Sequence, residues 1–401
     1  MGMRWGLGIV VTTVLLVLGG GVWWLILHED GDEGEVRATL SAAAVIAGSD
    51  TAGYARATEP RAFRFPEDHG PHPEFRTEWW YLTGNLRQPS DGRRFAYQLT
   101  FFRNALSPEG VGRASAWDTN QLWMAHLAIT DVASDMHVYE ERFARGAAGL
   151  AGAEPDPFRV WLEDWTILGS ESETFPLSVR AEKDRWAVDL TLREGKPPVF
   201  QGDEGLSRKG PNPGDASYYL SFTRLPTTGM LTLEGVQFEV VGDSWMDREW
   251  STSALGEEHL GWDWFSLQLD DGREIMFFEL RRKDGEPEPL NHGSFVEVDG
   301  SYRSLAADDV EIQVLNTWAS PLDGTEYPSG WQLRLPALDL ELTLEPMVQD
   351  QEMNLSVRYW EGAIRVTGRD ADGPVEGVGF AELTGYGEDP EARGQGLFGP
   401  R

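Results

Sequence analysis

Short runs of alternating apolar and polar residues recur along most of this chain, from about residue 60 to residue 390. In residues 338–344, leucines occupy every second position, with polar residues between them. Because side chains of a β-strand point alternately to its two faces, this pattern predicts strands with one buried face. Asp-Gly pairs, which are typical of tight hairpin turns, separate several runs. The clearest runs are residues 95–102, 122–132, 158–168, 186–192, 217–223, 230–241, 264–269, 274–280, 310–314, 338–344 and 363–368.

Helical spacing is scarce in this region. No apolar run with a helical period is longer than about three turns after residue 60. A series of antiparallel strands leaves unpaired edges unless the sheet closes into a barrel or pairs with a second sheet. With 401 residues, the chain can form two such units, each with its own core. We therefore expect an all-β architecture with domains at 61–243 and 244–390 and a short tail at 391–401.

The amino-terminal segment has a different pattern. Residues 6–27 carry no charge and are long enough to cross a bilayer as a helix. Arg4 precedes this run and a cluster of carboxylates follows it, so the positive-inside rule places the rest of the chain in the periplasm or outside the cell. We expect an uncleaved signal-anchor over residues 1–28 and an acidic stalk over residues 29–60. The alternative is a cleaved signal peptide and a secreted protein.

The composition excludes several classes of function. There are 66 Asp and Glu against 34 Lys and Arg, giving a formal net charge of −32. Such a surface argues against nucleic-acid binding, which needs a basic face to neutralise phosphates. The chain has no cysteine, which excludes disulfides, thiolate catalysis and zinc bound through cysteine.

The common hydrolase and metal motifs are also absent. There is no Gly-x-Ser-x-Gly and no His-Glu-x-x-His. His69 and His72 lie in a loop rich in Gly and Pro, where a turn is the simpler interpretation and a weak metal site the other. Residues 205–211 form a basic, glycine-rich loop that closes over a pocket mouth, binds an anion or is simply exposed. We expect no metal and no cofactor.

Tryptophan beside a carboxylate is the most distinctive local pattern. An indole wall excludes water from a neighbouring carboxyl group and so raises its pKa, and the ring faces can stabilise a cation. Acids of this kind suit chemistry that begins with protonation of an apolar substrate. The alternative is that these indoles only fill the cores of an all-β protein. The pattern occurs at residues 78–81, 117–118, 161–165, 245–250, 262–265 and 360–361.

Four ionisable residues become candidates for chemistry. Asp247 and Glu249 are two apart, so an extended chain places them on one side, and Trp245 and Trp250 flank them. Glu78 precedes an aromatic run, and the alternation of residues 122–128 places His126 on one face with Leu122 and Met124, which we expect to be the inside of a barrel. The competing interpretation is structural: a core histidine, and carboxylates paired with Arg103 or Arg76.

Several of these motifs together resemble one known family. They are Glu78–Gly84, Ser207–Gly210, Ser217–Tyr219 with Thr223–Leu225, Trp245–Ser251, Gly261–Phe265 and Tyr359–Gly362. The chain is similar over residues 60–390 to the carotenoid 1,2-hydratase (hydroxyneurosporene synthase) family, within the lipocalin-like superfamily also described as predicted secreted hydrolases. That superfamily includes hydratases of isoprenoid double bonds and of prenylated flavonoids, and fungal Diels–Alderases.

The resemblance implies two tandem lipocalin-like antiparallel β-barrels behind the transmembrane helix, with an apolar cavity. It implies a cofactor-independent hydratase, a lyase acting on a C=C bond of an isoprenoid or carotenoid-like molecule. Asp247 matches the family's proposed catalytic aspartate, while Arg248 stands where many members have histidine. Asp247 would then protonate the alkene, and Glu78 or His126 would orient water, with Glu249 as a further acid. The expected substrate-binding residues are Trp79, Trp80, Tyr81, Trp245, Trp250, Trp262 and Trp264.

A second function fits the same fold. A membrane-anchored lipocalin-like protein could bind a lipid without changing it, and it would differ from the hydratase only in lacking a protonated acid that faces the ligand. Fold alone does not separate the two functions.

Overall fold

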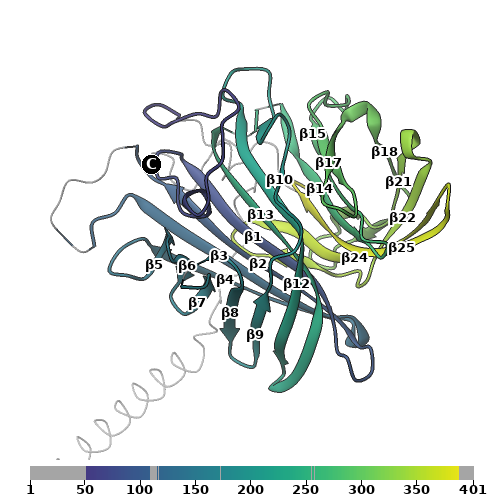
Figure 1. The fold of residues 1–401 in the computed structure, drawn as a ribbon, viewed down its shortest axis with the longest axis horizontal. Helices are drawn as coiled ribbons and strands as arrows, with labels where there is room; N and C mark the ends of the chain where they lie inside the picture. Colours follow the sequence, from purple (N-terminus) through teal and green to yellow (C-terminus); the bar gives the residue numbers. More distant parts are fainter. Residues whose placement is uncertain are drawn as a thin grey trace, which may run out of the picture. The chain divides into compact units, whose positions relative to one another are not determined.

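A computed structural model describes six stretches of the chain, and within them the fold is all-β, with four 3-10 turns as its helical elements (Figure 1). Among these residues no helix is both long and apolar enough to cross a bilayer. The predicted signal-anchor, most of the predicted stalk and the predicted tail lie outside the described residues. Described are residues 51–108, 115, 117–171, 173–253, 255–256 and 258–387.

The first sheet contains thirteen antiparallel strands in the order β4-β3-β2-β1-β13-β12-β9-β8-β7-β6-β5, with β10 and β11 also paired to β12. Beyond its neighbours in this order, β6 contacts β2, β3 and β4, so the sheet curls into a nearly closed barrel. The strands are β1 (Thr77–Arg87), β2 (Arg94–Ala105), β3 (Gln121–Asp131), β4 (Met136–Arg145), β5 (Ala151–Pro155), β6 (Phe158–Leu162), β7 (Trp165–Leu168), β8 (Leu177–Lys183), β9 (Trp186–Leu192), β10 (Val199–Phe200), β11 (Leu206–Arg208), β12 (Ala216–Leu233) and β13 (Val236–Ser253).

The second sheet contains ten strands in the order β17-β16-β15-β14-β25-β24-β22-β21-β18, with β23 also paired to β24. Its two edge strands, β17 and β18, are joined through the 3-10 turn Ala307–Asp309, so the sheet must curve into a half-barrel. Its strands are β14 (His259–Leu269), β15 (Glu274–Arg282), β16 (His292–Val296), β17 (Tyr302–Ala306), β18 (Glu311–Val314), β21 (Trp331–Leu335), β22 (Leu340–Pro346), β23 (Glu352–Asn354), β24 (Arg358–Asp370) and β25 (Gly373–Thr384). A separate hairpin pairs β19 (Thr317–Ala319) with β20 (Glu326–Pro328).

The domain boundary predicted between residues 243 and 244 falls inside β13. The whole of β13 pairs with β1 and β12 in the first sheet, and the second sheet begins with β14. The sequence pattern did not reveal this because β13 continues for 18 residues through Gly242, Asp243 and Ser244, which resemble a break between strands.

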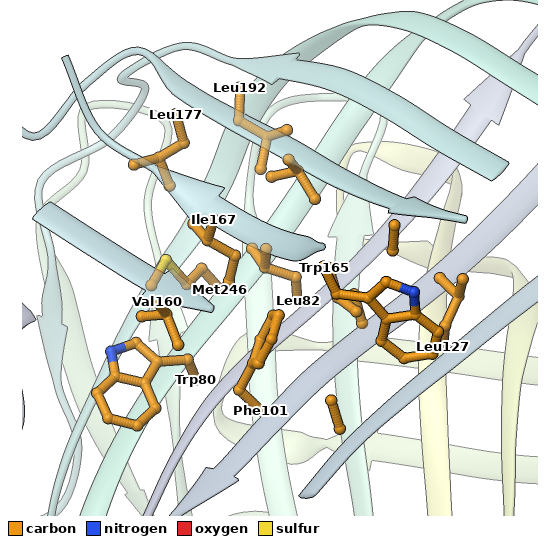
Figure 2. Close-up of a cluster of buried hydrophobic side chains, with 14 of the residues drawn as sticks. Trp80, Leu82, Phe101, Leu127, Val160, Trp165, Ile167, Leu177, Leu192 and Met246 are labelled. Carbon is orange, nitrogen blue, oxygen red and sulfur yellow. The ribbon is translucent and has the colours of Figure 1, made fainter. Parts of the chain in front are cut away.

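Large side chains fill the interior of the first barrel. Trp80 and Leu82 of β1 meet Phe101, Leu127 and Trp165 from other strands, and all five are fully buried (Figure 2). Aliphatic residues from β6, β7, β8 and β9 cover them from the opposite wall (Figure 2). The ligand cavity that we expected inside a barrel therefore cannot occupy this volume.

Residues preceding β1 also pack into the first barrel. The ring of His72 stacks on Trp250 with 3.8 Å between centroids, and Phe63 contacts Trp250 and stacks on Phe200. Ala57 is fully buried, and Tyr54 donates a hydrogen bond to the carbonyl of Ala105. The predicted stalk over residues 29–60 is therefore wrong for its last residues, which belong to the folded unit.

The face of β1 that points away from the barrel core looks toward the second sheet. Tyr81 packs in a buried cluster with Trp245 of β13 and with Trp264 and Phe380 of the second sheet. Asn85 donates a hydrogen bond to the carbonyl of Gly379. This contact between the outer faces of the two sheets forms the surroundings of the candidate site.

Candidate functional site

A pocket lies between the two sheets, and we call it the inter-sheet pocket. It contains about 740 Å³ of space between protein atoms, counted together with solvent at its mouth. Aromatic rings and carboxyl groups both reach it because each contributing strand turns every second side chain outward from its own barrel core. Its lining consists of Trp79, Tyr81, Gln98, Thr100, Phe102, Lys209, Tyr219, Asp247, Glu249, Leu255, Trp262, Trp264, Phe278, Leu280, Tyr359, Glu361 and Glu382.

Asp247 of β13 faces this pocket and is held by neutral hydrogen-bond donors on neighbouring side chains. Tyr219 donates its hydroxyl proton to Oδ2 at 2.6 Å, and Trp245 donates its indole N–H to Oδ1 at 2.7 Å. Trp264 donates to the Tyr219 oxygen at 3.0 Å, which fixes that hydroxyl. Among the described residues Asp247 has no ion-pair partner, so its carboxyl is oriented without being neutralised.

Burial of this carboxyl, which is 3% exposed, raises the pKa of Asp247 from its usual 3.8 to about 7. The hydrogen bonds from Ser221, Tyr219 and Trp245 lower the pKa but do not cancel the effect of lost hydration, and the charge of Glu249 raises the pKa further. The expected raised pKa is therefore confirmed, although the cause differs in part. The indole N–H of Trp245 lowers the pKa of Asp247 by bonding the carboxylate. Trp250 lies on the other face of β13, inside the barrel, and does not wall this carboxyl group.

Glu249 lies on the same face of β13 as Asp247, as the sequence spacing predicted. Its Oε1 accepts a hydrogen bond from Nζ of Lys209 and forms an ion pair with it. Lys209 follows β11 in the glycine-rich loop 205–211, so this loop does border a pocket. Glu249 is therefore engaged in an ion pair, which sets it apart from Asp247 as a candidate acid.

Two further carboxyl groups enter the pocket from the second sheet. Glu361 of β24 and Glu382 of β25 are directly opposite each other in the antiparallel register. Burial, together with the neighbouring carboxylate charges, raises the pKa of Glu382 to about 8, although a hydrogen bond from Trp262 opposes the shift. Burial and the charge of Glu382 also raise the pKa of Glu361 well above its usual value. The two carboxyl groups therefore hold protons near neutral pH.

The sequence interpretation missed this pair. Glu361 appeared in the motif Tyr359–Gly362, but nothing local marked Glu382, and only the pairing of β24 with β25 brings the two together. Tyr219 likewise appeared in the motif Ser217–Tyr219, but its role at Asp247 depends on the pairing of β12 with β13 and was missed.

His126 lies on the opposite face of β3 from the one we expected. The barrel core takes Ala125 and Leu127, so His126 points outward and bonds Tyr359 of the second sheet at 2.6 Å. Its other ring nitrogen lies 2.9 Å from Oε1 of Glu141. Leu122 and Met124 share its face, as predicted, but that face contacts the second sheet instead of the barrel interior. His126 lines a smaller cavity that shares Trp79, Phe102, Trp262, Tyr359 and Glu382 with the inter-sheet pocket.

Glu78 belongs to a buried ion network inside the end of the first barrel. It accepts hydrogen bonds from Arg248 at 2.7 Å and from Arg103 at 3.0 Å, and it lies 2.7 Å from His72. Burial alone would raise the pKa of Glu78, but the Arg248 charge and the His72 and Arg103 contacts hold it far below its usual value. Glu78 thus has the ion pair with Arg103 that the structural interpretation predicted, and Arg248 is a further partner that we did not expect.

The predicted substrate-binding aromatics divide between two places. Trp79, Tyr81, Trp262 and Trp264 line the inter-sheet pocket, and Trp245 supports Asp247 from behind. Trp80 and Trp250 lie in the core of the first barrel and do not line the pocket, because they are one residue out of phase with the pocket-facing side chains.

The two loop histidines do not form a shared site. His69 closes the 3-10 turn Glu67–His69 and packs its ring against Phe222, while His72 contacts Asp68 and Glu78. Within the described ranges no group of three or more His, Asp or Glu side chains is arranged to hold a metal ion.

Comparison with known proteins places this fold in a family. A family model described as AttH-like matches residues 56–386. A crystal structure assigned as AttH from Nitrosomonas europaea is 33% identical, with 83% of this chain and 99% of that chain covered and a TM-score of 0.72.

Two other solved structures share the fold at 15% identity. Kievitone hydratase from Nectria haematococca has a TM-score of 0.62, with 82% of this chain and 96% of that chain covered. CghA with Sch210972 has a TM-score of 0.51, with 86% of this chain and 97% of that chain covered. Among curated proteins, none matches this chain. The resemblance inferred from the sequence motifs is confirmed at the level of the family, and the chain belongs to the AttH-like family.

Proposed function

We propose that this chain is a cofactor-independent hydratase that adds water to a C=C bond of an apolar, isoprenoid-like molecule bound in the inter-sheet pocket. One observation carries the proposal: the carboxyl of Asp247 faces an aromatic pocket and has a pKa near 7. A general acid works best when its pKa lies near the working pH, because it is then both protonated and able to release its proton.

The residues of the pocket support each step. Asp247 donates its proton to one alkene carbon, which leaves a tertiary cation at the other carbon and a carboxylate at Asp247. Trp79, Trp262 and Trp264 present aromatic rings that can stabilise the cation. Water then adds to the cation, and the extra proton of the bound water passes to the Asp247 carboxylate, which restores the acid. In this proposal Glu78 and His126 have no direct role.

The lining of the pocket supports an apolar substrate. Most of its side chains are aromatic or aliphatic, with a few polar groups between them, as in pockets that bind small apolar molecules. Kievitone hydratase is by its name a hydratase, and it shares this fold over 82% of the chain. At 15% identity this kinship supports the reaction class and leaves the substrate to experiment.

We also propose, from the sequence, that the two units are tandem lipocalin-like barrels and that residues 1–28 anchor the chain in a membrane with its bulk outside the cytoplasm.

The test uses isoprenoid alkenes with a terminal trisubstituted double bond, incubated with the protein in water labelled with oxygen-18. Mass spectrometry should detect an alcohol that contains one labelled oxygen. Asp247→Asn should lower the rate by at least roughly a hundredfold, the usual contribution of a general acid, while the affinity for the alkene stays nearly the same. The exposed turn variant Asp270→Asn is the matched control.

If the alkenes bind but neither the parent protein nor the control forms the alcohol, the chain is the lipid-binding protein of the second interpretation. Turnover by Asp247→Asn at the parent rate would remove Asp247 from the mechanism.

A further inference from the structure

Glu361 has an oxygen without a partner inside the inter-sheet pocket. Tyr81 donates a hydrogen bond to Oε1 at 2.5 Å, whereas Oε2 is buried and has no hydrogen-bond partner among the described residues. The side chain is 1% exposed and lines the pocket. A buried polar atom without a partner is destabilising, so such an atom on a pocket wall points to a donor supplied by a ligand.

The pocket also has more acidic groups than cations. Of the described residues in its lining, Lys209 is the single cationic one, and it forms an ion pair with Glu249. Within the described part of the chain, Asp247, Glu361 and Glu382 have no ion-pair partner. A ligand with a positive charge would therefore meet three unpaired carboxyl groups, any of which becomes its counter-ion by losing a proton.

The remaining lining favours an organic cation over a metal ion. The rings of Trp79, Tyr81, Trp262 and Trp264 surround the carboxyl groups. Aromatic faces attract an ammonium group, and the same rings exclude the water that a small hydrated ion would keep. Tyr81 is the cross-strand neighbour of Asp247 and also bonds Glu361, so it separates the two acids.

We infer that the inter-sheet pocket selects apolar molecules that carry a protonated amine, with the ammonium group bonded to Oε2 of Glu361. The inference deepens the proposed function and rests on it, since it concerns the substrate class of the same pocket. The apolar part of such a ligand extends past Tyr81 toward Asp247. The tertiary cation of the proposed reaction is also a cation in apolar surroundings. The same carboxyl groups and aromatic rings would therefore stabilise both the bound ammonium group and this cation.

Isothermal titration calorimetry on the full chain tests this selection with three probes of equal length: octylamine, octanol and octanoate. Near neutral pH the amine should bind at least tenfold more tightly than the alcohol, and the alcohol more tightly than the acid. Equal affinities for amine and alcohol, or tighter binding of octanoate, would overturn the inference.

Variants locate the ammonium group. Glu361→Gln should lower the affinity for octylamine at least tenfold and leave that for octanol unchanged, and the control Glu376→Gln, exposed on β25, should change neither. If Glu361→Gln does not fold, Glu382→Gln replaces it in the same comparison. Octylamine affinity that survives in the folded pocket variant would contradict the placement.

Proton release gives a second measurement. The ammonium group stabilises the ionised form of a carboxyl, so octylamine binding should expel protons, whereas octanol binding should not. Titrations near pH 7 in two buffers of different ionisation enthalpy measure this release. The titrating groups that face Glu361 are Tyr81, Lys209, Asp247, Glu249, Tyr359 and Glu382. Octylamine binding with no proton release would overturn the inference.

The failure of this inference and that of the hydratase proposal are distinguishable. If the chain is not a hydratase, labelled alcohol is absent, but the preference for octylamine remains. If the amine selection is wrong, the three probes bind without regard to charge, while the loss of turnover in Asp247→Asn is unaffected.

Discussion

Replacing Asp247 by asparagine should change how the stability of the fold depends on pH, and this holds whatever the substrate is. Asparagine has nearly the same shape and stays neutral at every pH. Its carbonyl can still accept from Trp245, and its amide can donate to the oxygen of Tyr219. Any change in the free energy of unfolding that comes from this exchange of hydrogen bonds is the same at all pH values. It therefore cancels when the variant and the parent are compared at two pH values.

The size and the sign follow from the raised pKa of Asp247. In the unfolded chain the carboxyl loses its proton near 3.8, whereas in the folded protein it keeps the proton until about 7. Between these values the unfolded state binds fewer protons, so the stability of the parent protein falls as the pH rises. A shift of about 3 units corresponds to about 4 kcal/mol, of which roughly 3 kcal/mol lies between pH 5 and pH 8. The variant lacks this loss.

Urea unfolding followed by tryptophan fluorescence measures the effect. The difference in free energy of unfolding between Asp247→Asn and the parent protein should be about 3 kcal/mol more favourable to the variant at pH 8 than at pH 5. Asp270→Asn removes a carboxyl from an exposed turn and should show no such dependence. If the two differences for Asp247→Asn are equal, the pKa of Asp247 is not raised, and its role as general acid fails with it.

Two further outcomes are expected. Glu78→Gln should destabilise the fold by about 3–5 kcal/mol, because it leaves Arg248 and Arg103 buried with weakened pairing. Because the pKa of Glu78 is lowered, the parent protein loses this stabilisation as the pH falls toward that pKa, so the variant and the parent should become equally stable in strong acid. Equal stability at pH 7 would refute the network. A fragment of residues 51–387 should be soluble without detergent. It should also be more stable than a fragment that begins at residue 58, because the shorter fragment loses the burial of Ala57 and the hydrogen bond from Tyr54. Equal melting temperatures of the two fragments would show that residues 51–57 do not stabilise the fold.

Particular residues show how far the sequence could be interpreted. The spacing of Asp247 and Glu249 correctly predicted a shared face, because alternation along one strand is a local property. The same rule grouped His126 with Leu122 and Met124, but it could not say which face of β3 the barrel would enclose, since both faces of that strand are apolar. Glu78 stood beside an aromatic run, yet the partners that hold it charged come from β2, β13 and the preceding loop.

The sequence by itself determined the all-β class, the family, the strand-by-strand alternation and the presence of acids beside indoles, because each of these depends on neighbours within a few positions or on recurring motifs. Only the tertiary structure decided which of those acids stay protonated. Asp247, Glu361 and Glu382 come from two sheets and meet between their outer faces, whereas Glu78 meets Arg248 and Arg103 inside a barrel. The physical reason is that a carboxyl pKa is determined by the water and the charges within a few ångströms of it, and chain segments far apart in the sequence supply both.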